Sequence, residues 1–151
     1  MPSEVVLGSI YAAVKALLAA NTSLTALIST KPLGGAAIYD EGGVVQAATM
    51  PYLAIGAGTQ VPNHTMGGLA AARYGWNCTF QIKATGQGSE AAGLAIMSQV
   101  ASILKEGTSL GLAGYAYSFV DEFTMQPTIV TTQAAVITRE WPAILRVQCH
   151  D

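Results

Sequence analysis

Charged side chains are scarce in this sequence. Only 11% of its 151 residues are Asp, Glu, Lys or Arg, against about 25% in an average soluble domain. Seven basic and nine acidic residues are too few to cover the surface of a chain of this size. The remaining surface consists of small uncharged residues or is covered by other proteins. We favour the second interpretation, which predicts a chain that assembles with copies of itself and with partners.

Basic clusters and long apolar runs are also lacking. The net charge is −2 and the basic residues are scattered, so tight binding of nucleic acid through its phosphates is not expected. No run reaches 18 apolar residues, and we therefore predict no membrane span. The apolar N-terminus has Glu4 where a signal peptide is positively charged, and Lys15 interrupts it. We do not expect it to be a signal peptide.

Residues with catalytic or metal-binding chemistry are few. The two cysteines, Cys78 and Cys149, have no metal-ligand spacing; we expect two buried free thiols, with a disulfide as the alternative. The histidines are His64, in a predicted loop, and His150, in a predicted solvated tail. The sequence has no G-x-S-x-G motif. We therefore predict no catalytic, cofactor-binding or metal site, and no enzymatic activity.

Paired acids and one glycine motif are the remaining candidates for chemistry. The acids occur as Asp40-Glu41 and Asp121-Glu122, and adjacent residues on a strand point to opposite faces, so neither pair forms a catalytic dyad. Residues 86–91 read Gly-Gln-Gly-Ser-Glu-Ala, which matches the dinucleotide-binding pattern G-x-G-x-x-A. The preceding strand alternates instead of being apolar throughout, and the acidic residue about 20 positions on, Glu106, falls at the end of a predicted helix and not on a second parallel strand. We interpret the motif as a turn with a Ser89 helix cap, and keep nucleotide binding as an alternative.

Hydrophobic periodicity predicts an order of helix, strands, helix, strands. The clearest strand, residues 74–84, alternates apolar and polar side chains over its whole length. The segment 58–73 has no periodicity and is predicted to be a long loop, and Pro142 predicts a break in the last strand. The other expected elements are a helix from a Ser3 cap to Ala20, a short helix capped by Thr22 or Ser23 after Asn21, strands at 52–57, 115–123 and 134–149, and a helix from Ser89 to about Gly107.

The alternating strands indicate a sheet with one wet face. We therefore expect a single domain, residues 1–151, of the α+β class: a mainly antiparallel sheet with two long helices packed on one face.

The order of several short motifs resembles one known family. The motifs run from a helix at 10–18 through residues 23–28, Ile38-Tyr39 and Met50-Pro51-Tyr52-Leu53-Ala54-Ile55 to His64-Thr65-Met66-Gly67-Gly68, with Arg73 ahead of the long strand. Over residues 7–105 this sequence is similar to the tail completion, or tail terminator, proteins of long-tailed bacteriophages. The segment 124–135 departs from that family, because it is longer and nearly uncharged.

The resemblance implies a structural virion protein. Such a chain would form a hexameric ring that caps the tail tube and joins it to the head connector, with DNA only as passing cargo and no membrane partner. It would be made in the host cytoplasm and end at the head-proximal end of the tail. The alternatives are another head-tail connector or a tail tube subunit. By position, the family's lumen or subunit-interface loop would here contain Asn63, His64, Thr65, Met66 and Arg73.

Overall fold

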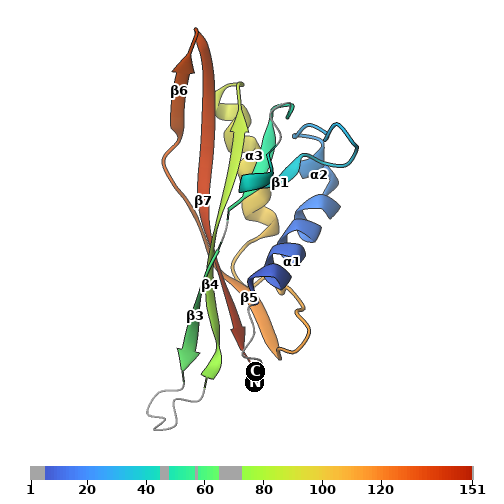
Figure 1. Ribbon diagram of the computed structural model, residues 1–151, viewed down its shortest axis with the longest axis vertical. Coiled ribbons are helices and arrows are strands. Elements are labelled where there is room, and N and C mark those ends of the chain that lie inside the picture. The colour runs from blue at the N-terminus through green and yellow to red at the C-terminus, as the bar shows by residue number, and fades with distance from the viewer. Residues whose placement is uncertain (1–5, 45–47, 57, 65–72, 151) are drawn as a thin grey trace.

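The computed structural model describes residues 6–44, 48–56, 58–64 and 73–150, and these form one sheet with helices against it (Figure 1). The helices are α1 (Leu7–Ala20), α2 (Thr22–Thr25) and α3 (Glu90–Ile103), with a 3₁₀ turn, η1 (Glu41–Gly43). The strands are β1 (Ile38–Asp40), β2 (Tyr52–Ile55), β3 (Thr59–His64), β4 (Arg73–Gly86), β5 (Tyr117–Met125), β6 (Ile129–Gln133) and β7 (Val136–His150).

Two long antiparallel strands, β4 and β7, form the centre of the sheet. Their register runs from Gly75 opposite His150 to Gly86 opposite Arg139. On its outer side, β4 pairs with β3 along its first half and with β2 along its second half. In the same way, β7 pairs with β6 along its first part and with β5 along the rest. Only β1, which pairs with β2, runs parallel to its neighbour among the described strands. The predicted mainly antiparallel sheet is therefore present, with one parallel pair, β1 and β2.

The helices α1 and α3 lie on the same side of the sheet (Figure 1). Each has 14 residues, which is shorter than the predicted spans. The first turn after the predicted Ser3 cap lies outside the described residues, and α3 ends at Ile103 because Leu104 leaves the helical backbone conformation. The predicted pair of long helices is thus corrected to two helices of moderate length.

Polar caps define the helix ends where the sequence offers them. Ser89 caps α3 as predicted, since its hydroxyl accepts a hydrogen bond from the Ala92 amide at 3.2 Å. Asn21 ends α1 and also caps α2, because its side-chain oxygen accepts from the Leu24 amide at 2.9 Å. The predicted Thr22 or Ser23 cap for the short helix is therefore wrong by one or two residues.

The core lies between the central strands and the helices. The predicted alternation of β4 is confirmed: Trp76, Cys78, Phe80, Ile82 and Ala84 are all buried. The same alternation on β7 buries Trp141, Ala143, Leu145, Val147 and Cys149. Residues spaced three or four apart on the helices, Ile10, Val14 and Leu18 on α1 and Gly93, Ile96, Met97 and Val100 on α3, cover them.

Part of the predicted long loop, residues 58–73, is a strand. Residues 59–64 form β3, which pairs with β4 from Thr59 opposite Thr79 to Val61 opposite Asn77 and onward. The strand lies at an edge of the sheet, where proline is tolerated because one side of the strand needs no hydrogen-bond donor. Pro62 and the polar neighbours hide this strand from a search for periodicity.

The predicted break in the last strand is also wrong, because β7 continues through Pro142. The Pro142 carbonyl accepts a hydrogen bond from the Gln126 amide at 2.9 Å. In an antiparallel strand the N–H and C=O of one residue point to the same neighbour. The missing N–H therefore points to where β5 ends at Met125 and β6 begins at Ile129, and no ladder bond is lost.

The segment 124–135, which departs from the resembled family, contains an additional strand. β5 starts and ends two residues later than predicted, with a register shift between Val120 and Glu122. After it, β6 turns back into β7 through Ala134 and Ala135. We call residues 129–138 the arm. Figure 1 shows the arm extending beyond the helices at the top of the molecule.

Candidate interaction surfaces

Three of the five residues predicted to form a lumen or interface loop lie at the end of the β3–β4 ribbon. Asn63 and His64 end β3, and Arg73 begins β4 opposite His64. Thr65 and Met66 lie outside the described residues. The backbone thus brings the two sides of the predicted loop together at one end of the sheet, away from the arm (Figure 1).

The two thiols are buried and free, as predicted. Burial raises the pKa of Cys78 to about 12, with a further contribution from Cys149. Burial likewise raises the pKa of Cys149 to about 11. Both side chains are therefore protonated thiols at neutral pH, which is the opposite of what a nucleophile or metal ligand needs.

His150 is part of β7 and not a solvated tail. Its ring stacks on Phe119 with 6.0 Å between ring centroids, and its Nε2 lies 2.9 Å from Oε1 of Gln148. A stacked, hydrogen-bonded ring at the end of the sheet is a packing element. Within the described ranges, no group of three or more His, Cys, Asp or Glu side chains is placed to hold a metal ion.

The G-x-G-x-x-A segment is a strand-to-helix turn held by ionic contacts. Arg139 donates to the Gly88 carbonyl at 2.8 Å and lies 3.8 Å from Glu90. The strand that follows α3, β5, is separated from β4 by β7, whereas a dinucleotide-binding unit places its two strands side by side. The turn also carries the Glu90 carboxylate, which would repel a phosphate. These features argue against nucleotide binding here.

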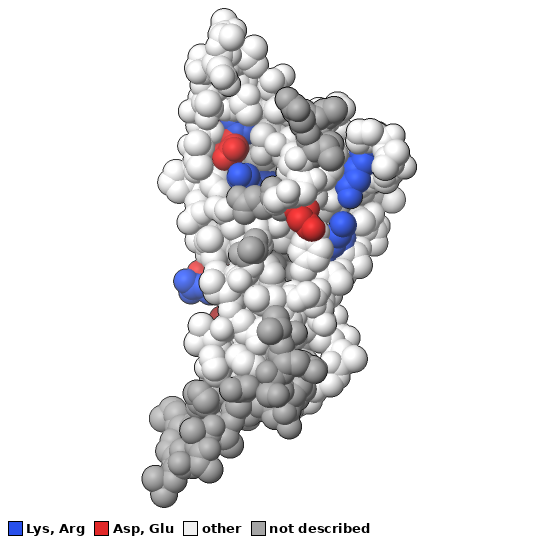
Figure 2. Space-filling view, in the orientation of Figure 1, with Lys and Arg blue, Asp and Glu red and all other residues white. Residues whose placement is uncertain are grey.

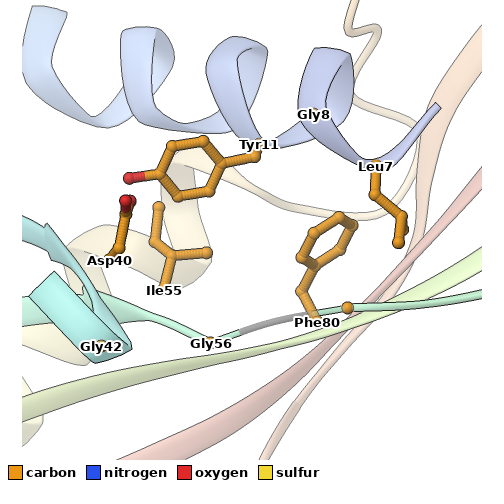
Figure 3. Close-up of a pocket in the computed structure, with 9 residues that line it drawn as sticks. Leu7, Gly8, Tyr11, Asp40, Gly42, Ile55, Gly56 and Phe80 are labelled. Carbon is orange, nitrogen blue, oxygen red and sulfur yellow. The ribbon is translucent and has the colours of Figure 1, made fainter. Parts of the chain in front are cut away.

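An apolar groove lies between α1 and the β1–β2 edge of the sheet. It has a volume of about 470 Å³ and is lined by Leu7, Gly8, Tyr11, Asp40, Gly42, Ile55, Gly56, Gly58 and Phe80. Figure 3 shows the Tyr11 hydroxyl and the Asp40 carboxylate pointing toward one another across it. The Phe80 ring lies so close to Gly58 that a Cβ there would come within 2.8 Å of it. With one carboxylate and no nucleophile among these residues, the groove suits an apolar contact.

Several of the charged residues make contacts at the base of the arm. Glu90 accepts a hydrogen bond from the Thr128 hydroxyl at 2.6 Å in addition to its contact with Arg139. Lys83 and Glu140 lie 3.5 Å apart on β4 and β7. These contacts connect the arm to α3 and to the central strand, so the arm leaves the body in a defined direction.

The arm itself is uncharged and apolar on both faces. Residues 123–138 contain no charged side chain, and Figure 2 shows the top of the molecule without acidic or basic colour. Large apolar side chains are 43–56% exposed along it: Ile129, Val130, Val136 and Ile137. Met125, which ends β5 before the arm, is 40% exposed. The sequence shows that this stretch lacks charge. It does not show that the stretch forms an exposed surface, because β6 was not predicted.

Comparison with known proteins gives one line of evidence. No protein-family model matches this sequence, and no curated protein matches it. Among solved structures, the chain is similar to a protein of the virion of a native gene transfer agent particle, with 20% sequence identity and a TM-score of 0.68. The similarity covers 99% of this chain and 100% of the other. It shows a shared fold.

The described part of the chain has no helix long and apolar enough to cross a membrane.

Proposed function

We propose that this chain is a structural protein of a phage-like virion, and that it forms the ring that ends the tail. The observation that carries the proposal is the fold shared over the full length with a protein of a gene transfer agent virion. The motif order of the tail terminator proteins, found in the sequence without reference to that structure, supports the finer role. The whole chain, residues 1–151, acts as one unit in this proposal.

In this role the chain assembles into a hexamer at the head-proximal end of the tail tube and provides the surface on which the head connector docks. The scarcity of charge supports it, since each ring subunit covers surface on two neighbours. A lumen that only lets DNA pass needs no strong attraction for phosphate, and a net charge of −2 suits that. Neither an enzymatic step nor a membrane partner belongs to this function.

A binding experiment with separated virion parts tests the role. Labelled protein is mixed with tail tubes that lack their end protein, and the tubes are imaged by negative-stain electron microscopy. A terminator binds at one end of each tube and makes the tubes competent to join DNA-filled heads. Label along the whole tube would indicate a tube subunit, and label only on heads a connector; either result would contradict the terminator role.

The β3–β4 end is the proposed lumen or interface loop, and Arg73→Glu tests it. We expect the variant to fold, since Arg73 begins β4 at the end of the sheet, but to assemble more weakly by about tenfold, as for a charge reversal at an interface. Assembly is measured by sedimentation at ordinary salt, and Lys105→Glu, which lies just beyond α3, is the control. Equal assembly of both variants removes Arg73 from the interface.

A further inference from the structure

The four outer strands of the sheet differ in whether they are protected against pairing with another strand. Edge strands present unpaired N–H and C=O groups, and natural proteins blunt them with proline, charge, bulges or short length. β3 contains Pro62, β1 has three residues and ends at Asp40, and β5 carries Asp121 and Glu122 at a register shift. β6 has none of these devices: its sequence is Ile-Val-Thr-Thr-Gln, without a bulge in its pairing with β7.

The register of the arm tells which groups of β6 are free. Gln133 and Val136 flank the two-residue turn, so they form a hydrogen-bonded pair, as in a turn closed from the first to the fourth residue. Bonded and non-bonded pairs alternate along an antiparallel ladder. Thr131 is therefore bonded to β7, while Val130 and Thr132 direct their N–H and C=O groups outward. β6 pairs with no other strand in the described part of the chain.

We propose that β6 is a self-pairing edge, on which the β6 strand of a second copy of this chain docks antiparallel about a two-fold axis at Thr131. In that register Val130 faces Thr132 of the second copy, and Thr132 faces its Val130. The four outward groups on each strand then form four hydrogen bonds. The partner is a second copy because β6 is the one unprotected edge that the described residues offer, and because two identical uncharged strands meet without like-charge repulsion.

Side chains favour the same contact. The exposed apolar residues lie on both faces of the arm, Val130 and Ile137 on one and Ile129 and Val136 on the other. An isolated two-stranded ribbon is marginally stable in water, and three or more strands are needed for independent stability. Pairing turns two such ribbons into a four-stranded sheet with an apolar patch on each face. The contact is two-fold, so it is separate from the head-to-tail contacts that close a ring.

Disulfide capture tests the register directly. In the proposed pairing the two Thr131 residues form a non-bonded pair with about 4.5 Å between Cα atoms, which lies within the range of a disulfide. Gln133 instead faces Ile129 of the other copy, and the two Gln133 Cα atoms are about 13 Å apart. The native thiols are buried and do not compete. Under mild oxidation, Thr131→Cys should give a covalent dimer and Gln133→Cys should not.

A proline variant tests whether the backbone edge is responsible. Thr132→Pro, added to Thr131→Cys, removes one outward N–H per strand, hence two of the four bonds, and should slow the covalent capture about tenfold. Its own ladder with β7 does not use that N–H, so melting temperature and circular dichroism should be retained. Thr132→Ala keeps the N–H and is the control.

Equal capture at positions 131 and 133, or capture at neither, overturns the proposal whether or not the proline variant folds. Ring formation that persists while position 131 gives no capture overturns it without touching the proposed function.

Discussion

At the scale of single residues, Gly93 makes a close contact between α3 and the sheet, against Trp141 of β7. A Cβ on Gly93 would come within 2.0 Å of the indole ring, and Trp141 is 1% exposed. The ring therefore lies against the helix backbone itself. This contact explains why a glycine, which weakens a helix, stands in the first half of α3.

Gly93→Ala is accordingly expected to destabilise the protein by about 1–3 kcal/mol, the usual cost of overpacking a core. The matched control is Gly8→Ala on α1, where a Cβ meets nothing within 4 Å. That substitution should be neutral or stabilise by up to about 1 kcal/mol. Urea denaturation measures both, and equal effects of the two variants would contradict the packing described.

The two buried thiols make the stability depend on pH in the alkaline range. In the unfolded chain a thiol ionises near pH 9, whereas folding raises the pKa of Cys78 to about 12 and of Cys149 to about 11. Below pH 9 both states keep the proton and the thiols cause no change with pH. As pH rises above 9 the unfolded state loses protons first, so the free energy of unfolding falls until the folded pKa values are reached.

We therefore expect the urea midpoint to fall between pH about 9 and about 10.5, and to fall less in a variant with Cys78→Ala and Cys149→Ala. Native protein should also react slowly with a thiol reagent at neutral pH and release two equivalents on unfolding. A steeper fall in the variant without thiols would contradict this account.

At the scale of elements, the turn of the arm is the most unusual feature. Ala134 and Ala135 have φ of 50° and 66°, in the left-handed region, where residues other than glycine lose about 1–2 kcal/mol each. Two-residue hairpin turns of this kind normally contain Asn-Gly. Two methyl groups thus stand at the tip of an uncharged arm at a cost in stability, as expected of a tip that contacts another protein.

The double variant Ala134→Asn with Ala135→Gly should raise the free energy of unfolding by about 1–2 kcal/mol. Thermal melting of the dilute chain is the measurement, and Ala134→Ser with Ala135→Ser, which keeps the unfavourable conformation, is the control. A lower melting temperature for the Asn-Gly variant would show that the alanines are not strained.

The same elements show how far sequence reasoning reaches. The strand β4 and the Ser89 cap were predictable because each rests on a local pattern. In β4 the pattern is the alternation of apolar and polar residues, and at Ser89 it is a serine directly before a helix with apolar residues three and four apart. β3 and the unbroken β7 were not, because Pro62 and Pro142 are tolerated only through the position of neighbouring strands. The arm was missed for a related reason, since nothing in Ile129 to Gln133 tells which residues will be left exposed on both faces.

The candidate surfaces depend even more on tertiary structure. The loop around His64 and Arg73 was placed by resemblance, and its role stays a prediction. The groove beside Tyr11 brings together residues from four separate segments, and no spacing in the sequence predicts it. The scarcity of charge predicts a surface that partners cover, but only the sheet topology locates an uncharged surface on the arm.

At the scale of the whole molecule, three features occur together: a scarcity of charge, an arm without charge at one end of the sheet, and a fold shared with a virion protein. Together they support the proposal that the chain is a subunit of a larger assembly. Its central claim is that the chain closes into a ring of defined size.

The most direct test is the mass of the purified protein in solution, measured by sedimentation or light scattering over a range of concentrations and followed by negative-stain imaging. The account predicts a discrete species of about six copies that appears as a closed ring. A protein that stays strictly monomeric at high concentration, and that never forms rings when tail tubes are added, would contradict it.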